Sequence, residues 1–479
     1  MLTPSHPDWA AVYVLVEWLI RLLAVVIVPL RRPPATATAW LLLIFFQPVM
    51  GGVFYLFVGR PRAAKARQAK IDQLSAALAP IQAHLSTQHP AHPVTATLPD
   101  RWRPIAQLAS HWRAFPIFDG NHISLIEELP RLVVRLAADI DAAQRSIHLL
   151  FYIAARDEQT EPVFAALLRA AARGVEVRLL IDDFGSKHCL APLLALEAQG
   201  IRVARAFPRS KLPRRAARFD LRNHRKIVVI DGQIGYTGSM NLIRPDFKAP
   251  LIYEDIMLRI EGPVVLELQT VFAGDWYIER NILLTGAQYF PTPGRVGPSI
   301  CLGLPSGPEY PDPVQQQILT ALIHASVQSI RLVTPYFVPD EPTLIALKAA
   351  AQRGVEVELI LADTLDQRLV QWAQESYYEE LLAEGVMIRR YPNRFLHTKF
   401  GVFDDHLSLI GSANLDVRSN LINAEFGLIF FSPHMAELLN RLLHRYRESA
   451  RLLTAEAWRL RTRPAMLRQN LARLATPLL

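Results

Sequence analysis

The apolar and polar positions of the chain follow one pattern up to about residue 60 and another in the rest. The first part is apolar almost throughout. Further on, "SIHLLFYIAARDE" and the Ala-rich "FAALLRAAARGVEVRLLIDDFGSK" have counterparts in "SIRLVTPYFVPDE" and "ALKAAAQRGVEVELILAD". An apolar run, an amphipathic helical run, a glycine and a second apolar run therefore occur twice. This order predicts βαβ units, with a mostly parallel or mixed sheet flanked by helices in each copy.

A short polar motif follows in each copy. The first reads "NHRKIVVIDGQIGYTGSMN" and the second "LHTKFGVFDDHLSLIGSANL". Four pairs of motif residues are each separated by 173 residues: His224 and His397, Asp231 and Asp404, Ser239 and Ser412, and Asn241 and Asn414. A single H-x-K-x4-D match has a chance of roughly 10⁻⁴ per position, so two copies with matching tails indicate a duplicated domain.

The N-terminal apolar segments predict a membrane hairpin. Ala10–Leu30 is long enough to cross a bilayer, and Glu17 and Arg21 are four residues apart, where they can pair on one helical face. Pro33–Gly59 has no charged residue and supplies a second span, broken in its middle by Gln, Pro and Gly. A cleaved signal peptide is disfavoured, because a basic n-region and an A-x-A-like site are lacking. More basic residues follow the second segment than lie between the two, which places the body in the cytoplasm.

These patterns divide the chain into five parts. We expect two transmembrane helices in residues 1–60, a basic juxtamembrane helix and linker in 61–119, a first lobe in 120–290, a second lobe in 299–440 and a basic amphipathic C-terminal helix in 441–479. The predicted fold class is α/β, with two homologous lobes that share one active site, preceded by the transmembrane hairpin. The C-terminal helix has two alternative positions, on the membrane surface or packed against the lobes.

The composition indicates a compartment and a type of partner. Only Cys189 and Cys301 are present, without the spacing of a zinc site, so we expect a reducing compartment. The formal net charge of +8 favours a polyanionic partner, either nucleic acid or an anionic lipid surface. Basic residues outnumber acids most clearly in one run, which contains Arg202, Arg205, Arg209, Lys211, Arg214, Arg215, Arg218 and Arg222 beside the single acid Asp220. This run is either a site for anionic headgroups or a solvated loop.

The doubled motif carries the candidate chemistry. Side chains two apart on a strand point to the same face, so each motif offers a His and a Lys together. If the two copies meet across a pseudo-twofold axis, one pocket receives His224, Lys226, Asn241, His397, Lys399 and Asn414. Such a set suits phosphoryl transfer, since lysines and asparagines bind the non-bridging oxygens while one imidazole attacks phosphorus and the other protonates the departing alkoxide. Because the lysines neutralise the developing charge, we expect no metal and no cofactor.

Each imidazole in such a site needs an acceptor for its other ring nitrogen. Asp255 in "YEDIMLRIEGP" and Glu425 in "NAEFGLIFFSP" stand at corresponding places of the two copies and are the candidates. Ser239 and Ser412 are the candidates to hold those two carboxylates. The sequence leaves open which carboxylate serves which imidazole.

The doubled H-x-K-x4-D-x6-G-S-x-N resembles the motif of the phospholipase D superfamily. More narrowly, "FYIAARDE", "TPYFVPDE", "LIGSANLDVRSNLINAEF" and the two N-terminal apolar segments are similar to those of bacterial cardiolipin synthases, over nearly the whole chain. The resemblance implies catalytic roles for the basic pair of each motif, namely His224, Lys226, His397 and Lys399. Asp231 and Asp404 belong to the same catalytic motif, and in relatives they mainly support its structure. Many relatives carry a second glycine where this chain has Ser239, so the resemblance assigns that serine no unique role.

The activity that this resemblance implies is a transesterification. One phosphatidylglycerol gives a phosphatidyl-histidine and free glycerol, and the terminal hydroxyl of a second takes the phosphatidyl group to form cardiolipin. The implied partners are phosphatidylglycerol and anionic membrane lipids, with no nucleic acid. The implied location is the bacterial inner membrane, multi-pass, with the catalytic lobes on the cytoplasmic side.

Other functions fit the same residues. A phosphodiesterase of the superfamily that hydrolyses phospholipid or cleaves DNA would use the same pocket. Two apolar spans and the lack of interleaved aromatic and basic residues disfavour a nuclease. A non-catalytic scaffold would predict decay of one motif, whereas both are intact. Transfer and hydrolysis differ only in whether a lipid hydroxyl or water reaches the phospho-histidine.

Overall fold

The computed structural model describes residues 9–32, 34–57, 59, 65–88, 98–111, 116–208, 221–310 and 313–476. These residues fall into two compact units, one formed by the described residues up to Ala69 and the other by Lys70–Pro208 with Leu221–Leu479. The first unit consists of α1 (Trp9–Ile27), α2 (Pro34–Phe46), α3 (Pro48–Phe57) and the start of α4 (Lys65–Gln88). The second unit, called the body below, contains both copies of the repeat.

The first unit differs from the expected pair of spanning helices. Among the described residues one helix, Trp9–Ile27, is long and apolar enough to cross a membrane. The expected second span is divided into the shorter helices α2 and α3, because the chain breaks at Gln47 before Pro48, a residue that cannot continue a helix in its interior. The predicted pairing of Glu17 with Arg21 is confirmed at 3.4 Å. Arg60 and Arg62, two of the residues used to orient the hairpin, lie outside the described residues.

The first half of the body contains the first copy of the repeat. Its elements are β1 (Phe118–Ile126), α7 (Leu129–Ala142), β2 (Ser146–Phe151), α8 (Glu161–Ala172), β3 (Glu176–Asp182), α9 (Leu190–Leu194), η1 (Ala195–Gln199), β4 (Arg202–Ala206), β5 (Ile227–Ile230), β6 (Ile234–Gly238), β7 (Tyr253–Glu254), β8 (Met257–Glu261) and α10 (Val265–Arg280). The β2–α8–β3 unit is the predicted βαβ unit, and its two strands pair in parallel.

The second half repeats this order after the connection at residues 281–298. Its elements are β9 (Ser299–Ser306), α11 (Val314–Ala325), β10 (Ser329–Thr334), β11 (Phe337–Val338), α12 (Glu341–Gln352), β12 (Glu356–Ala362), α13 (Arg368–Ser376), α14 (Tyr378–Ala383), β13 (Met387–Tyr391), β14 (Phe395–Leu396), β15 (Phe400–Phe403), β16 (Leu407–Gly411), β17 (Leu415–Asp416), α15 (Val417–Leu421), β18 (Glu425–Phe430) and α16 (Pro433–Ser449). Again the βαβ unit, β10–α12–β12, has parallel strands.

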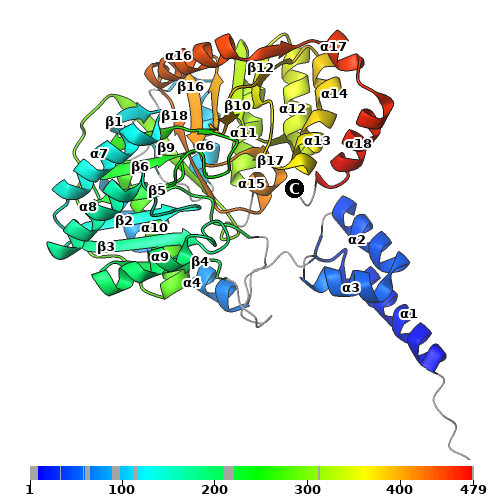
Figure 1. The fold of residues 1–479 in the computed structure, drawn as a ribbon, viewed down its shortest axis with the longest axis horizontal. Helices are drawn as coiled ribbons and strands as arrows, with labels where there is room; N and C mark the ends of the chain where they lie inside the picture. Colours follow the sequence, from blue (N-terminus) through cyan, green and yellow to red (C-terminus); the bar gives the residue numbers. More distant parts are fainter. Residues whose placement is uncertain are drawn as a thin grey trace, which may run out of the picture. The chain divides into compact units, whose positions relative to one another are not determined.

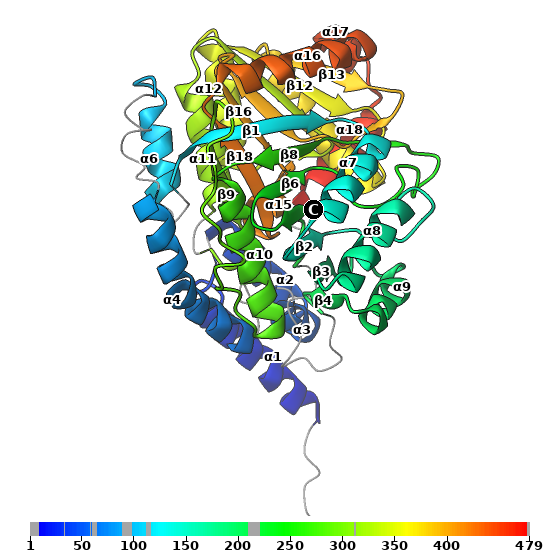
Figure 2. The same ribbon diagram turned by 90° about the vertical axis from the view of Figure 1, so that its left-hand side faces the viewer.

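One mixed sheet runs through both halves (Figures 1 and 2). Its strand order is β19-β13-β12-β10-β15-β16-β18-β9-β1-β8-β6-β5-β2-β3-β4, where β19 is Arg451–Leu453. Read outward from the central pair β1 and β9, the two halves have the same order of equivalent strands. The pair itself is antiparallel, with Phe118 opposite Cys301 and Asn121 opposite Ser299. An antiparallel junction relates the halves by an approximate twofold rotation, so the mixed α/β sheet predicted for each copy is here joined into one.

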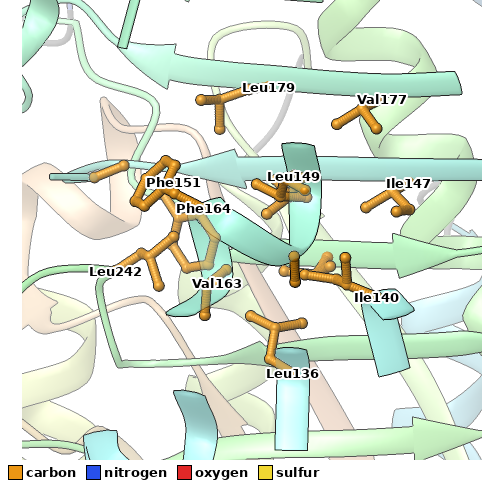
Figure 3. Close-up of a cluster of buried hydrophobic side chains, with 14 of the residues drawn as sticks. Leu136, Ile140, Ile147, Leu149, Phe151, Val163, Phe164, Val177, Leu179 and Leu242 are labelled. Carbon is orange, nitrogen blue, oxygen red and sulfur yellow. The ribbon is translucent and has the colours of Figure 1, made fainter. Parts of the chain in front are cut away.

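Helices cover both faces of the sheet, so its central strands are apolar on both sides. In β2, Ile147, Leu149 and Phe151 point into a core with α7 and α8, shown in Figure 3. The alternate residue His148 points to the other face, where its ring stacks on Phe272 of α10 at 4.5 Å. This alternation is the period of two that a strand imposes, and it explains why all six residues of β2 are buried.

The linker and the C-terminal segment differ from the sequence predictions. The expected linker contains α6 (Arg103–His111), and the described part of 441–479 is not one helix. It holds the end of α16, then β19, α17 (Ala455–Arg459) and α18 (Arg463–Arg473), because β19 adds a strand to β13 and interrupts the helical pattern. Gln469 of α18 donates to Glu375 of α13 at 2.8 Å, which supports the packed alternative for this segment.

Candidate active site

Both motif histidines lie where a strand pair joins the two halves of the body. The backbone N–H of His224 donates to the carbonyl of Ala424 at 2.8 Å, and that of His397 donates to Glu254 at 2.8 Å. The second contact extends the parallel pairing of β14 with β7, and the first forms a matching bridge between Asn223 and Ala424. Each histidine is thereby fixed beside the residue that precedes a carboxylate of the opposite half.

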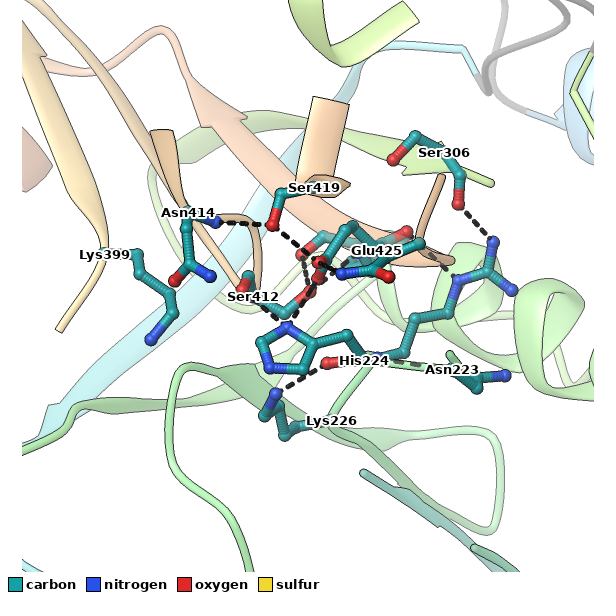
Figure 4. Close-up of polar contacts among 12 residues, drawn as sticks. Asn223, His224, Lys226, Ser306, Lys399, Ser412, Asn414, Ser419 and Glu425 are labelled. Carbon is teal, nitrogen blue, oxygen red and sulfur yellow. Dashed lines mark hydrogen bonds and ion pairs between the residues drawn. The ribbon is translucent and has the colours of Figure 1, made fainter. Parts of the chain in front are cut away.

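The carboxylates pair with the imidazoles in a crossed arrangement. Nδ1 of His224 lies 3.0 Å from Oε2 of Glu425, and Nδ1 of His397 lies 2.8 Å from Oδ1 of Asp255. Figure 4 shows the first pair, in which the ring of His224 and the carboxylate of Glu425 point toward one another from different halves. Each motif therefore needs the other half for its acceptor. With Nδ1 donating, Nε2 of each ring keeps its lone pair for chemistry.

Hydroxyl and amide donors from the second half hold the Glu425 carboxylate. Ser412 donates to Oε2 at 2.5 Å, and Ser419 and Asn423 donate to Oε1 at 3.0 and 3.4 Å. The carboxylate is fully buried, so these donors replace the water that it loses. The predicted role of Ser412 agrees with this geometry, whereas Ser419 and Asn423 are additional residues that the motif spacing did not indicate.

The G-S pair of each motif is explained by the neighbouring strand. A side chain at Gly238 would lie 2.5 Å from the carbonyl of Ile256, and one at Gly411 would lie 2.5 Å from the carbonyl of Phe426. Because the glycines permit this close approach, the serine after each glycine contacts the backbone of the neighbouring strand. The hydroxyl of Ser239 accepts from the N–H of Ile256 at 3.0 Å, next to Asp255.

The two motif lysines are buried and share one geometry. Nζ of Lys226 donates to the carbonyl of His224 at 2.6 Å, and Nζ of Lys399 donates to the carbonyl of His397. Burial lowers the pKa of Lys226 to about 8 and that of Lys399 to about 7, against the attraction of Asp255 and Glu425. Both ammonium groups are poorly hydrated as a result, which strengthens their attraction for an anion.

The imidazoles are neutral bases in the free site. Burial lowers the pKa of His397 to about 4, and burial also lowers the pKa of His224. The charge of Lys226 depresses the pKa of His397, and that of Lys399 depresses the pKa of His224, so each lysine acts on the ring of the opposite half. This mutual influence places both motifs in one electrostatic environment.

The partner carboxylates are ionised. Burial alone would raise the pKa of Glu425, but His224, Lys226 and the hydroxyl of Ser412 bring it down to about 2. The pKa of Asp255 is also lowered, because its contact with His397 and the charge of Lys399 outweigh burial. A fixed negative charge behind each imidazole stabilises the positive charge that develops on the ring when it attacks or takes a proton.

The two motif asparagines take different contacts. The side-chain oxygen of Asn241 accepts from the N–H of Ile153 at 3.1 Å, which directs its amide group away from the backbone. In Asn414 the amide donates to Asp416 at 3.1 Å. Its side-chain oxygen is buried and has no hydrogen-bond partner within the described residues. Asn414 also lines a small cavity of about 30 Å³ together with Lys399.

Asp231 and Asp404 lie at the opposite strand ends from the lysines and do not meet the imidazoles. The carboxylate of Asp231 accepts from the backbone N–H groups of Gln144, Arg145 and Ser146, all at 2.8 Å. That of Asp404 binds the equivalent groups before β10 at 2.8–3.2 Å. These contacts tie the start of β2 and β10 to the motif strands, so the structure gives both aspartates a supporting position.

Two tyrosines against the imidazoles were not identified from the sequence. The ring of Tyr152 meets His224 edge-on with centroids 4.8 Å apart, and that of Tyr253 packs on His397 at 5.1 Å. Tyr152 directly follows β2, whose end pairs with the start of β5 next to Lys226. An aromatic residue at that strand end is the signal that indicates a contact with the motif.

Arg225, between the two catalytic residues of the first motif, was also missed. Its guanidinium is fully buried, bound to Asp275 at 2.6 Å, and its Nε donates to the carbonyl of Glu425 at 3.0 Å. The corresponding Thr398 donates to the carbonyl of Glu254 at 3.1 Å. In each motif the residue between His and Lys therefore holds the backbone that carries the opposite carboxylate.

The basic run before the first motif is only partly described. Arg205 pairs with Asp183 at 3.1 Å, and the guanidinium of Arg222 lies 4.0 Å above the ring of Phe184. Arg202 pairs with Glu176. The other members, together with Asp220, lie outside the described residues: Arg209, Lys211, Arg214, Arg215 and Arg218.

Comparison with known proteins gives consistent similarities in sequence and fold. The family model described as "Cardiolipin synthase, PLD-like domain" matches residues 136–276 and 319–447, and a "Phospholipase_D-nuclease N-terminal" model matches residues 10–60. Cardiolipin synthase A of Wigglesworthia glossinidia brevipalpis is 33% identical over 458 residues, covering 92% of this chain and 91% of the relative. Cardiolipin synthase A of Erwinia tasmaniensis is 33% identical over 444 residues, covering 89% and 90%. The solved phosphatidylserine synthase of Haemophilus influenzae Rd KW20 aligns with a TM-score of 0.61 at 13% identity, over 78% of this chain and all of that one, which shows a shared fold.

Proposed function

The chain belongs to the bacterial cardiolipin synthases of the phospholipase D superfamily, and on this basis we propose that it transfers a phosphatidyl group between two phosphatidylglycerol molecules. The products are cardiolipin and glycerol. The observation that carries the proposal is the crossed pairing of each motif imidazole with a carboxylate of the other half, beside two buried lysines. This arrangement supplies two equivalent imidazoles to one phosphodiester.

The first step forms a phosphatidyl-histidine. The lone pair of one Nε2 attacks phosphorus, and the bond from phosphorus to the glycerol headgroup oxygen breaks. The other imidazole gives a proton to the departing oxygen, so glycerol leaves uncharged. That imidazole is neutral in the free site, and the negative charge of the bound phosphodiester raises its pKa so that it carries the required proton.

The second step reverses the first with a different alcohol. The terminal hydroxyl of the second phosphatidylglycerol gives its proton to the free imidazole, and its oxygen bonds to phosphorus as the phosphorus–nitrogen bond breaks. Lys226, Lys399, Asn241 and Asn414 supply positive charge and donors for the non-bridging oxygens through both steps. Ser239, Asp255, Ser412 and Glu425 position the imidazoles.

The location that fits this substrate is the inner membrane. Large apolar side chains of α1, α2 and α3 are exposed in the first unit, including Trp18, Leu22 and Phe46, as lipid-facing residues would be. We place the catalytic body on the cytoplasmic side with the chain passing the membrane more than once, from the basic residues that follow residue 59 in the sequence. Homologous lobes at 120–290 and 299–440 are part of this proposal.

The test follows the products of one labelled lipid. Purified full-length protein in detergent micelles is given phosphatidylglycerol labelled in the headgroup, and products are identified by mass. Cardiolipin and free glycerol in equal amounts support the proposal. Phosphatidic acid and glycerol without cardiolipin would instead identify a hydrolase that uses water in the second step.

A further inference from the structure

A pocket of the body lies beside the half of the site that contains His397. It encloses about 240 Å³, and its wall includes Asn241, Asp255 and Tyr253. Asp255 holds the imidazole of His397 and Tyr253 packs on the same ring, so a molecule in this pocket lies next to the reacting groups. Apolar side chains make up much of the remaining wall, and Arg394 stands on it as well.

Arg394 is exposed. Arg244, the other arginine of the wall, is bound by Asp246 at 2.8 and 2.9 Å. Arg394 makes no hydrogen bond or ion pair within the part of the chain that the structure describes. Burial raises the pKa of the nearby Glu254 carboxyl, and the charge of Arg394 opposes this rise, so the two groups lie near each other without pairing. A cation that lines a pocket and forms no ion pair with a described residue can bind an anionic group of a ligand.

Arg394 has no basic counterpart at the matching position of the first copy. The residue 173 positions before Arg394 is Leu221, which is buried. Two positions before the carboxylate, the first half has Tyr253 and the second has Asn423. Two identical copies of the motif would form two identical binding sites. Because the residues beside the two copies differ, the two substrate molecules can bind in different ways.

We propose that this pocket binds the headgroup of the acceptor phosphatidylglycerol and that Arg394 binds the acceptor's phosphate, an inference that rests on the proposed function. The phosphate of the donor lipid binds the two motif lysines, so a further cation is needed only for the phosphate of the second lipid. Glu254, which accepts the hydroxyl of Tyr391 at 3.0 Å, offers carboxylate oxygen to the secondary hydroxyl of the acceptor glycerol. The terminal hydroxyl then reaches phosphorus as its proton passes to the imidazole that is not phosphorylated.

A comparison of two acceptor molecules tests whether Arg394 binds the acceptor's phosphate. Free glycerol and phosphatidylglycerol present the same hydroxyls, but only the lipid carries a phosphate. The full-length Arg394→Ala variant is assayed in micelles for cardiolipin formation and for exchange of labelled free glycerol into phosphatidylglycerol. Arg459→Ala, which removes an exposed arginine far along the chain in α17, is the matched control for one lost surface charge.

The expected result is selective. Cardiolipin formation at limiting phosphatidylglycerol falls about tenfold in Arg394→Ala, which is the effect of one charge-assisted hydrogen bond to phosphate, and glycerol exchange stays within twofold of the unchanged protein. Arg394→Lys recovers part of the lost rate, and Arg459→Ala changes neither reaction. An equal loss of both reactions, or a loss of neither, overturns the assignment of Arg394. Absence of cardiolipin from the unchanged protein would overturn the proposed function instead.

Discussion

Replacement of Glu425 by Gln removes one charge from the active site while keeping its shape. Oε2 accepts from His224 and Ser412, and an amide oxygen at that place can still accept both. The new NH₂ group then takes the place of Oε1, where Ser419 and Asn423 now donate. The hydroxyl of Ser419 can rotate to accept, and Asn423 can turn its side-chain oxygen, which is buried without a partner in the described structure, toward the NH₂ group. Glu425→Gln therefore isolates the charge.

The size of the effect follows from the pKa of Glu425. A fall from 4.5 to about 2 corresponds to about 3 kcal/mol in favour of the ionised form in the folded protein. Because the folded pKa is the lower one, this stability is fully present above about pH 4.5 and is lost as the pH falls toward 2. At neutral pH we expect Glu425→Gln to lower the melting temperature of the body by several degrees. The difference from the unchanged protein should shrink at pH values below 4.5.

The effect on catalysis should be larger than the effect on folding. Without a negative charge behind Nδ1, the positive charge that develops on the His224 ring loses its partner in a dry site, and we expect kcat to fall about 10²- to 10⁴-fold. The assay measures cardiolipin formation at saturating phosphatidylglycerol, beside a thermal scan of the same sample.

A matched control is available in the same fold. Glu267 is another fully buried glutamate; its carboxylate accepts from the backbone N–H of Gly303, and burial raises its pKa well above the usual value. Glu267→Gln should keep the kcat of the unchanged protein. If Glu425→Gln is folded and its kcat lies within twofold of that value, the crossed pairing has no part in the chemistry.

Three further results are expected. His224→Ala and His397→Ala each abolish turnover, and added Mg²⁺ or Zn²⁺ restores neither, since the proposed steps use imidazole nitrogen; measurable cardiolipin from either variant contradicts a shared site. The pKa of Lys399 is about 7, so kcat/KM for phosphatidylglycerol should decline as the pH rises above 7. The decline of kcat should begin at a higher pH, because bound phosphate raises the pKa of the lysine. A decline of both parameters at the same pH refutes this. Asp404→Asn removes a carboxylate that binds three backbone N–H groups, so we expect about 2–4 kcal/mol lower stability with kcat per folded molecule retained, as measured by thermal scans beside active-site titration.

The amino-acid sequence by itself determined the local and repetitive features of this protein. Strand periodicity and the glycine turns gave the βαβ units, and the identical spacing of His, Lys, Asp, Ser and Asn gave the duplicated motif. The i,i+4 placement of Glu17 and Arg21 gave their contact. Each of these features joins residues close in sequence or compares one segment with its copy, and periods of 2 and 3.6 residues encode such relations directly.

Only the tertiary structure decided how the copies combine. The sequence named Asp255 and Glu425 as acceptors, but it did not indicate that each would serve the imidazole of the opposite half, 142 and 201 residues away. That exchange accompanies the antiparallel pairing of β1 with β9, which joins the two halves in one sheet. A pairing at such separation is fixed by the packing of whole strands, so no local pattern records it. For the same reason the sequence predicted one C-terminal helix, where pairing of β19 with β13 divides the segment.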